Sequence, residues 1–220
     1  MTNAGSPARA RPPAPDPTFE VLGDEPVAHA ASPTIKFTLR VTDSPERPLH
    51  AIALSAQINI DPARRTYDDA TRERLVELFG PAERWASTTR SFLWTQVGAL
   101  VPDFTGAAEF TLTVPCTYDL EISAAKYFYS LPDGEIPLTF HFSGTILFSD
   151  EGKVQIAMVP WSCSARYKLA VEDWKKMMGL YYPGGGWVRL QTSTLNRLQE
   201  RKAEAGLPSF DACVADLLEG

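Results

Sequence analysis

Metal sites and nucleophilic centres need histidines or cysteines at close spacing, and this chain has only three of each. They are His29, His50, His141, Cys116, Cys163 and Cys213. None of them stands in an HxH, HExxH or CxxC spacing, the patterns by which one element presents several ligands to zinc or to an iron–sulfur cluster. No cysteine has a histidine beside it that could stabilise a reactive thiolate. We therefore expect no catalytic residue, no metal site and no cofactor at these positions.

The string Ser123-Ala124-Ala125-Lys126 matches the SxxK pattern, in which a serine is the nucleophile and a lysine lies one helical turn beyond it. Here the string continues an alternating segment, 118–122, which predicts a strand. Positions three apart in a strand point to opposite faces, so the serine and the lysine could not meet. The SDN and KTG motifs that accompany SxxK are also missing. We therefore reject a serine–lysine site.

Two further patterns are typical of ligand sites but lack the residues that would complete them. Gly184-Gly185-Gly186 resembles a phosphate-binding loop, yet no Lys-Ser/Thr pair follows it, so we expect a hinge between helices. Acidic residues gather in loops, where their oxygens could bind Ca²⁺, but no loop has the Asp-x-Asp density of such sites. We expect ordinary turns and keep calcium binding as an alternative. The acidic loop residues are Asp61, Asp68, Asp69, Asp103, Asp133, Asp150 and Glu151.

The candidate binding site is a stripe of large apolar side chains. Its residues are Trp174, Met177, Met178, Tyr181, Tyr182 and Trp187. The first four recur at three- and four-residue spacing, which predicts one face of a helix, and such a face usually packs in a core. The alternative is a partly exposed patch beside a glycine hinge, with the Trp and Met content that protein interfaces favour. We expect some of these side chains to stay exposed, and predict that the patch docks a protein partner or a second copy of the chain.

Most of the chain alternates between apolar and polar residues with a period of two, which is typical of half-buried β-strands. The alternating segments are 35–42, 52–60, 110–114, 118–122, 138–148 and 154–158. Pro132-Asp133-Gly134 and the segment 149–152 supply tight turns, so the strands that they join run antiparallel. We predict a mainly β fold, an antiparallel β-sandwich of Ig- or C2-like type over residues 19–165. Its longest strand should bend or bulge at Gly144.

Helical patterns interrupt and follow this sandwich. Asp68 or Asp69 can cap a helix that runs to Phe79 and stops at Gly80-Pro81, as an insertion between strands. Residues 166–220 are predicted to form an α-helical section packed on the sandwich or extending from it. This section includes a helix over 194–205 and a last one capped by Ser209. Seven of the 18 prolines precede residue 34, and residues 1–18 have almost no large apolar side chain, which predicts a disordered tail.

Composition limits the classes of function. Of 220 residues, 44% are hydrophobic and 22% charged, which suits a folded domain of ordinary size. The 21 basic and 27 acidic residues give a net charge of −6, without the basic surface that nucleic acids require. No apolar run reaches the roughly 20 residues that cross a bilayer, no secretory leader is evident, and three scattered cysteines suit reduced thiols. We therefore expect a cytoplasmic protein with no nucleic-acid partner and no membrane insertion.

Several strings of the sequence resemble a known family when they are taken together. They are Leu54-Ser55-Ala56-Gln57-Ile58-Asn59-Ile60, Arg65-Thr66-Tyr67, Phe142-Ser143-Gly144-Thr145, Pro160-Trp161 and the segment from Trp174 to Trp187. The family is one of uncharacterised bacterial proteins, a domain of unknown function. Its members accompany nickel–iron hydrogenase genes of the high-affinity, hydrogen-oxidising kind. The resemblance implies an accessory or assembly role, with a hydrogenase subunit or maturation factor as partner, and assigns no catalytic residue.

Three functional hypotheses follow. The first is a non-catalytic accessory protein that acts by protein–protein contact or as a homodimer. The second, from a different class, is a small-ligand-binding or hydrolytic sandwich whose site combines distant residues such as His141, Asp119 and Glu121. The third is a calcium-dependent module that binds lipid or sugar.

Overall fold

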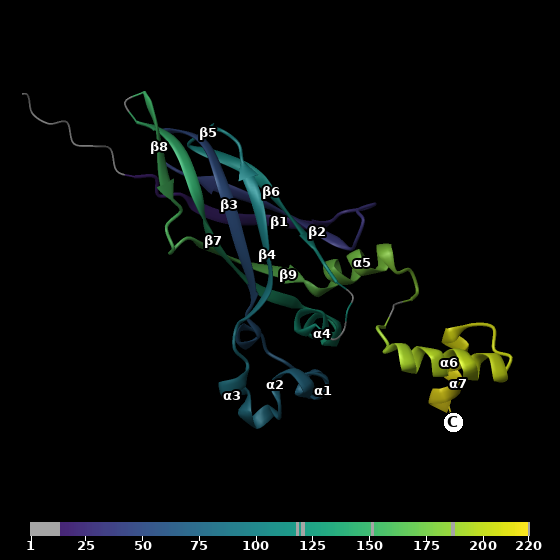
Figure 1. Cartoon of the computed structure of the whole chain (residues 1–220). Coiled ribbons are helices and arrows are strands. Elements are labelled where there is room, and N and C mark those ends of the chain that lie inside the picture. The colour runs from purple at the N-terminus through teal and green to yellow at the C-terminus, as the bar shows by residue number, and fades with distance from the viewer. Residues whose placement is uncertain (1–13, 118, 120–121, 151, 186–187, 220) are drawn as a thin grey trace, which may run out of the picture. The chain divides into compact units, whose positions relative to one another are not determined.

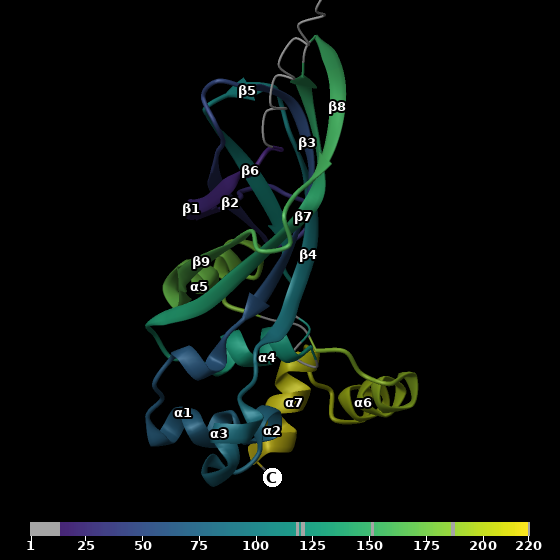
Figure 2. The same cartoon turned by 90° about the vertical axis from the view of Figure 1, so that its left-hand side faces the viewer.

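Two antiparallel β-sheets packed face to face form the main part of the chain, as the computed structural model shows side-on (Figure 2). The structure describes residues 14–117, 119, 122–150, 152–185 and 188–219. One sheet has the order β1 (Thr18–Pro26), β2 (Thr34–Thr42) and β6 (Ala107–Pro115). The other has the order β4 (Phe92–Val101), β3 (Pro48–Ile60), β7 (Glu135–Asp150) and β8 (Lys153–Met158), with β5 (Phe104–Thr105) beside β3 and β9 (Ser164–Ala170) beside β7 (Figure 1). The predicted antiparallel sandwich is confirmed.

Aromatic side chains from both sheets meet in the core between them. Phe37 of β2 and Phe140 of β7 are fully buried, and their rings meet edge to face with centroids 5.2 Å apart. Trp94 and Tyr167 pack on Phe37 in the same edge-to-face manner, at 6.2 Å and 5.8 Å. Such aromatic pairs add roughly 0.5–1.5 kcal/mol each beyond the apolar area that they bury. Alternate side chains of the strands therefore point into this shared core.

Five of the six predicted strands lie where the alternation placed them, as β2, β3, β6, β7 and β8. β1, β4, β5 and β9 were not predicted. In β4 the alternation is interrupted, because the pairing with β3 shifts register between Ile58 and Asn59 and leaves Trp94 without a partner. A bulge of this kind puts apolar residues out of phase along the sequence, which hides the strand from a period-two reading.

The sixth predicted strand, 118–122, is wrong for the residues of it that the structure describes, since neither Asp119 nor Ile122 is in a strand. A helix follows instead, α4 (Ser123–Ser130). Its buried side chains recur at helical spacing, and Phe128 packs between Trp94 and Trp174, with ring centroids 5.0 Å and 5.5 Å away. Packing against the sandwich therefore outweighs the short local alternation.

Gly144 is needed for close backbone contact, and the bulge predicted there is absent from the pairing with β3. The register of β7 on β3 is regular from Leu138 to Leu147, passing directly through Gly144. On its other edge β7 does change partner, from β9, which it pairs up to His141, to β8, which it pairs from Thr145. Gly144 has a φ of 147°, and a Cβ there would lie 2.1 Å from the carbonyl oxygen of Ala53. No side chain fits.

Helices at one end of the sandwich occupy the connection from β3 to β4 (Figure 1). They are α1 (Asp69–Arg74), α2 (Val76–Phe79) and α3 (Trp85–Thr88), with short 3-10 turns at Pro62–Arg64 and Ala82–Arg84. Asp68 caps α1 by accepting a hydrogen bond from the Thr71 amide at 2.8 Å, and α2 ends at Gly80. The predicted helical insertion is confirmed.

The chain divides into two compact units, Met1–Gly185 and Gly186–Gly220. Helix α5 (Val171–Tyr181) packs against β1, β2 and β9, so it belongs to the first unit although it was expected with the C-terminal helices. The second unit is a pair of helices, α6 (Thr192–Glu204) and α7 (Phe210–Glu219). Arg201 and Asp216 join them in an ion pair at 2.8 Å, and Cys213 is buried. Both helices were predicted, including the cap of α7 by Ser209, whose hydroxyl accepts from the Ala212 amide.

The predicted tail lies largely outside the described residues, which begin at residue 14. Its last part, however, is held against the first unit. Pro15 and Pro17 are buried, and the amide of Asp16 donates to the Asp43 carboxylate at 3.1 Å. The prediction of disorder is therefore wrong for residues 14–18, because two prolines find an apolar surface to cover.

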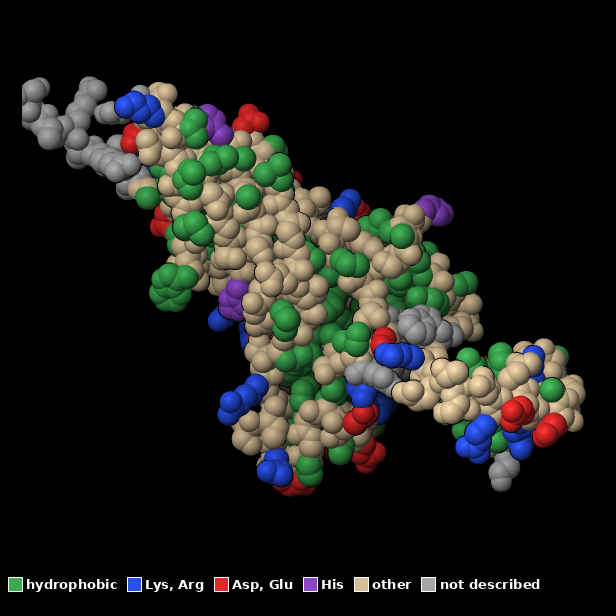
Figure 3. Space-filling view, in the orientation of Figure 1, with side chains coloured by type: hydrophobic (Ala, Val, Ile, Leu, Met, Phe, Trp, Pro, Cys, Tyr) green, Lys and Arg blue, Asp and Glu red, His purple; other side chains and the backbone are tan. Residues whose placement is uncertain are grey.

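The two sheets differ in the faces that they turn away from the core. The outer face of the three-stranded sheet carries charged residues such as Arg40 and Glu109, which pair at 2.7 Å across β2 and β6. The outer face of the six-stranded sheet, seen from the front in Figure 3, shows no red or blue in its middle. Across β3, β4, β8 and the middle of β7 its exposed side chains are small, polar and uncharged, or apolar, whereas β9 carries the exposed Arg166 and Lys168 at one edge.

Replacing Gly144 with Ala should lower the free energy of unfolding by about 2 kcal/mol or more, since the new Cβ meets a backbone oxygen and the φ is unfavourable for it. Urea unfolding followed by circular dichroism measures this. Gly23→Ala is the control, because nothing lies within 4 Å of its Cβ position. Equal losses in the two variants would contradict this account of Gly144.

Candidate functional site

A cavity of about 530 Å³ lies where the end of α4 and the loop after it face helix α5. We call it the α5 cavity. It is lined by Arg74, Tyr129, Ser130, Leu131, Pro132, Trp174, Lys175, Met178, Gly179, Tyr182 and Gly185, all in the first unit. Its size suits a large side chain or a small molecule.

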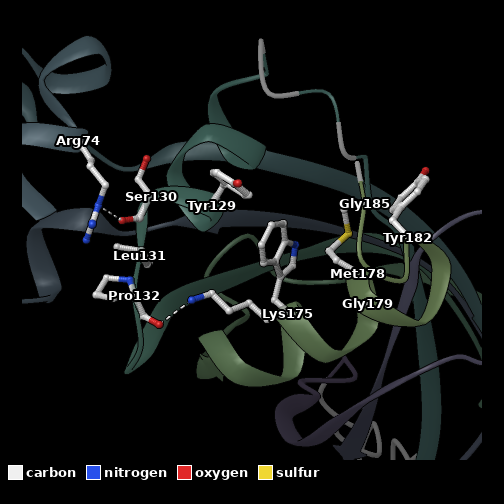
Figure 4. Close-up of a pocket in the computed structure, with 11 residues that line it drawn as sticks. Arg74, Tyr129, Ser130, Leu131, Pro132, Lys175, Met178, Gly179, Tyr182 and Gly185 are labelled. Atoms are coloured by element: carbon white, nitrogen blue, oxygen red, sulfur yellow. Dashed lines mark hydrogen bonds between the residues drawn. The ribbon is translucent and has the colours of Figure 1, made fainter. Parts of the chain in front are cut away.

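Local sequence chemistry builds the walls of this cavity. Pro132 follows α4 closely and cannot continue a helix, so the chain leaves α4 as a loop with Leu131 buried beneath it. The carbonyl oxygens of this loop are then bound by side chains. Lys175 reaches from α5 and donates to Pro132 at 2.6 Å, while the Arg74 Nε donates to Ser130 at 2.9 Å (Figure 4). These two bonds fix the position of the loop, one to α5 and the other to α1.

The cavity combines an apolar wall with two cationic groups. Trp174, Met178 and Tyr182 supply apolar surface from α5 and the turn after it. Within the described part of the chain, neither Arg74 nor Lys175 comes within 4.0 Å of a carboxylate. The lining contains no aspartate, glutamate, histidine or cysteine. The arrangement therefore favours an apolar group that carries or adjoins a negative charge.

The stripe predicted as a docking patch is mostly buried. Trp174 and Met178 are only 3% and 5% exposed, and Met177 is fully buried, because this face of α5 packs on the sandwich. Trp174 and Met178, two of the four residues of which some were expected to stay partly exposed, are thus buried, and both line a concave wall. Tyr182, half-buried, lines it too.

Two other residues of that stripe do not line the cavity. The hydroxyl of Tyr181 donates to the Val27 carbonyl at 2.7 Å and accepts from the Ala30 amide at 2.8 Å, which ties α5 to the loop after β1. Trp187 lies outside the described residues. Sequence reasoning missed Arg74 and Lys175, since nothing in their local sequence distinguishes them from other surface cations.

The serine–lysine pattern stands on a helix after all. Ser123 begins α4 and Lys126 lies one turn on, so the strand argument used against this pair is wrong. The reason is the tertiary packing that makes 123–130 helical. Lys126 forms an ion pair with Glu77 of α2, and Ser123 is exposed. The lysine is therefore engaged by a carboxylate of another helix and not by the serine.

The residues named for a site assembled from distant positions are not brought together. His141 is exposed on the outer face of β7, whereas Asp119 follows β6 of the other sheet. Glu121 lies outside the described residues. Among the residues that the structure describes, no three His, Cys, Asp or Glu side chains are grouped so that they could hold a metal ion.

The ionisable groups in the core serve packing. Burial raises the pKa of the Cys116 thiol to about 12, which disfavours its reactive thiolate. The hydroxyl of Tyr67 donates to the Pro62 carbonyl at 2.8 Å, so the Tyr127 hydroxyl, 2.7 Å away, donates to Tyr67. Burial raises the pKa of both tyrosines.

Asp24 is the one carboxylate among the described residues with a buried oxygen that lacks a hydrogen-bond partner, its Oδ2. Its Oδ1 accepts from the Tyr167 hydroxyl at 2.6 Å. Burial is the largest influence and raises the pKa of this carboxyl above its ordinary value of 3.8, although the hydrogen bond from Tyr167 acts the other way. The charged form is therefore the less favourable one in the folded protein.

Fold and site together define a two-sheet β-sandwich protein with an apolar, cation-bearing cavity. The chain belongs to DUF6084, a family of unknown function, whose model matches residues 14–220. No curated protein matches it in sequence. Within the described residues, no helix is long and apolar enough to cross a membrane.

Solved structures with similar folds are distant. The CARDB domain of a Pyrococcus furiosus protein, solved in complex with di-metal ions, is 9% identical with a TM-score of 0.29, over 77% of this chain and 98% of that one. The putative ApaA protein from Bordetella pertussis is 17% identical with a TM-score of 0.28, over 71% and 94%. A putative late embryogenesis abundant protein is 13% identical with a TM-score of 0.35, over 71% and 72%. Similarity at this level carries no argument about function.

Replacing Met177 with Ala should lower the free energy of unfolding by about 2–5 kcal/mol, because the change leaves a void in a packed core. Leu180→Ala on the same helix is the matched control, since Leu180 is 57% exposed, and should cost less than about 1 kcal/mol. Urea unfolding measures both. Equal stability of the two variants would mean that α5 is not packed as described.

Replacing Asp24 with Asn should stabilise the protein at about pH 7, because Asn still accepts from Tyr167 but carries no buried charge. A carboxyl with a raised folded pKa binds its proton more readily in the folded state, so the wild type gains relative stability as pH falls toward 3.8. The advantage of the variant should therefore shrink by about pH 4. Urea unfolding at both pH values tests this, with Asp103→Asn as a control for net charge. An advantage that stays constant with pH would contradict it.

Proposed function

We propose that the protein is a non-catalytic accessory factor that binds a partner protein through the α5 cavity. The bound group is an apolar side chain of the partner with a carboxylate beside it. The observation that carries this proposal is the combination of an apolar wall from Trp174, Met178 and Tyr182 with two cations that have no carboxylate partner within the described residues.

The two halves of the cavity have separate roles in this binding. The apolar wall is fixed in place, because Trp174 and Met178 are buried on their other sides, so an entering side chain displaces water without reordering the helix. Arg74 and Lys175 are held by backbone carbonyls at 2.9 Å and 2.6 Å, and Nη2 of Arg74 also donates to the Thr71 hydroxyl at 3.1 Å, so both cations are fixed in position. A carboxylate of the partner then adds orientation and selectivity to the apolar contact.

A binding role fits the lining better than a catalytic one does. The lining contains no carboxylate, histidine or cysteine that could activate a nucleophile. Its serine and lysine are bound to the backbone, since the Ser130 hydroxyl donates to the Lys126 carbonyl at 2.7 Å and Lys175 donates to the Pro132 carbonyl at 2.6 Å. As partner we propose a subunit or maturation factor of a nickel–iron hydrogenase, on the strength of the sequence resemblance alone. A cytoplasmic location is part of the same proposal.

Reversing the two cations, as Arg74→Glu with Lys175→Glu, should weaken partner binding at least about 10-fold, since it sets like charges against the partner's carboxylate. The control is Lys176→Glu, at the next residue along α5. Its ammonium group pairs with Glu172 at a distance of 3.1 Å, and it does not line the cavity. Binding is measured by calorimetry with the purified hydrogenase subunits, and circular dichroism confirms folding of each variant.

The cellular arm of the experiment uses a strain deleted for this gene and assayed for hydrogen uptake. The wild type and Lys176→Glu should restore uptake, and the doubly reversed variant should not. Full restoration by the doubly reversed variant would refute the role of the cavity. Unimpaired uptake in the deletion strain would refute the hydrogenase partner.

A further inference from the structure

The outer face of the six-stranded sheet differs from a normal solvent-facing sheet in having no charged residue at its centre. Segments 49–60, 92–101, 136–149 and 154–158 of β3, β4, β7 and β8 contain no Asp, Glu, Lys or Arg, in a chain that is 22% charged. The charged residues Arg166 and Lys168 of the same sheet lie on β9, at its edge. The three-stranded sheet serves as an internal reference. Its strands β1, β2 and β6 carry Glu20, Asp24, Glu25, Lys36, Arg40 and Glu109. If both outer faces only contacted solvent, both would be expected to carry charged residues.

A ridge of large apolar side chains runs along one edge of this face. Val154, Ile156 and Met158 of β8 alternate outward and are 66%, 70% and 67% exposed. Leu147 of β7 stands opposite Ile156 in the register and widens the ridge. Exposed strands usually carry charge to prevent association, and β8 has only Lys153 at its start.

A trough of small residues lies two strands away from the ridge. Ala53 and Ser55 of β3 and Gly98 of β4 are small and outward-facing, and Ser55 pairs with Gly98 across the strands. With Leu54, Ala99 and Leu100 they line a shallow hollow of about 410 Å³. Between ridge and trough, β7 presents the short side chains of Ser143 and Thr145.

We propose that this face binds a second copy of the chain, with the β8 ridge of each copy seated in the β3–β4 trough of the other. A two-fold axis over β7 makes both contacts at once, since such an axis exchanges the two sides of the strand on which it lies. The ridge and the trough are about 10 Å apart, because neighbouring strands lie about 4.8 Å apart. An axis that runs along β7 sets residues at the same height on the strands opposite each other, and Met158 and Ala53 are at the same height because each pairs with Thr145.

Size and charge both favour a second copy as the occupant. The charge-free segments of the four strands hold 41 residues, so they cover about 650 Å² at roughly 3.3 Å along and 4.8 Å across the strand for each residue, close to the roughly 800 Å² that one partner contributes to a standard stable interface. The chain has a net charge of −6, so two copies repel unless they meet on a face without acidic residues. This face provides that condition, and the three-stranded sheet does not.

The dimer is tested by sedimentation velocity on the full chain. Two separate variants each place one charge in the contact, a positive charge on the ridge and a negative charge in the trough. The wild type should dimerise with a Kd of about 100 μM or below. Met158→Lys on the ridge and Ala53→Asp in the trough should each weaken the dimer at least 10-fold, since every homodimer then contains two charges facing apolar surface. Thr111→Lys, on the outer face of the three-stranded sheet, is the matched control and should remain dimeric.

Mixing the two variants tests the geometry itself. In a heterodimer, the lysine introduced on the ridge of one copy would face the aspartate introduced in the trough of the other, while the second contact is unchanged. An equimolar mixture should therefore regain the dimer. A monomeric wild type would overturn the proposal, and so would dimers unaffected by both substitutions. Failure of the mixture to associate would overturn the ridge-in-trough contact. None of these outcomes depends on the α5 cavity or its partner.

Discussion

The contact between Phe37 and Phe140 joins the two sheets, and the remainder of the first unit depends on it. Both rings are fully buried and meet edge to face at 5.2 Å. The two rings meet only when β2 and β7 each turn this parity of side chains inward, so the contact determines which face of each sheet forms the core. β7 then carries β3, β8 and β9 as hydrogen-bonded neighbours, and the close backbone approach at Gly144 holds it against β3.

The same aromatic core extends to the helices that form the cavity. Phe128 of α4 stands between Trp94 of the sandwich and Trp174 of α5, at 5.0 Å and 5.5 Å. This stack sets the spacing of α4 and α5, and therefore the place where the loop at Leu131 leaves room beside α5. The cavity is thus a consequence of core packing. Its two cations, Arg74 and Lys175, lie at its margin because their side chains bind the loop.

Two surfaces of the first unit depart from ordinary solvent-exposed surface, and they do so in different ways. The α5 cavity is concave and positively charged at its margin, which favours a partner with an apolar group and a carboxylate. The outer face of the six-stranded sheet is broad and carries no charged residue over segments 49–60, 92–101, 136–149 and 154–158, which favours a copy of the same chain. Because the two surfaces are built from different elements, a dimer formed through the sheet can bind a partner at each α5 cavity.

The sequence by itself determined the class of fold, because period-two alternation in β2, β3, β6, β7 and β8 is a local property of the chain. The capped insertion at Asp68 and the final pair of helices were likewise readable from local signals. Features that depend on contacts between distant segments were decided by the tertiary structure alone. The bulge at Trp94 hid β4, and packing of Phe128 turned a segment expected to be a strand into α4. It also decided that Trp174 and Met178 face a core rather than solvent, and that Arg74 and Lys175, 101 positions apart in the numbering, bind the same loop. The physical reason is that burial and long-range side-chain contacts depend on which elements meet, and the periodicity of a single segment holds no information about its neighbours.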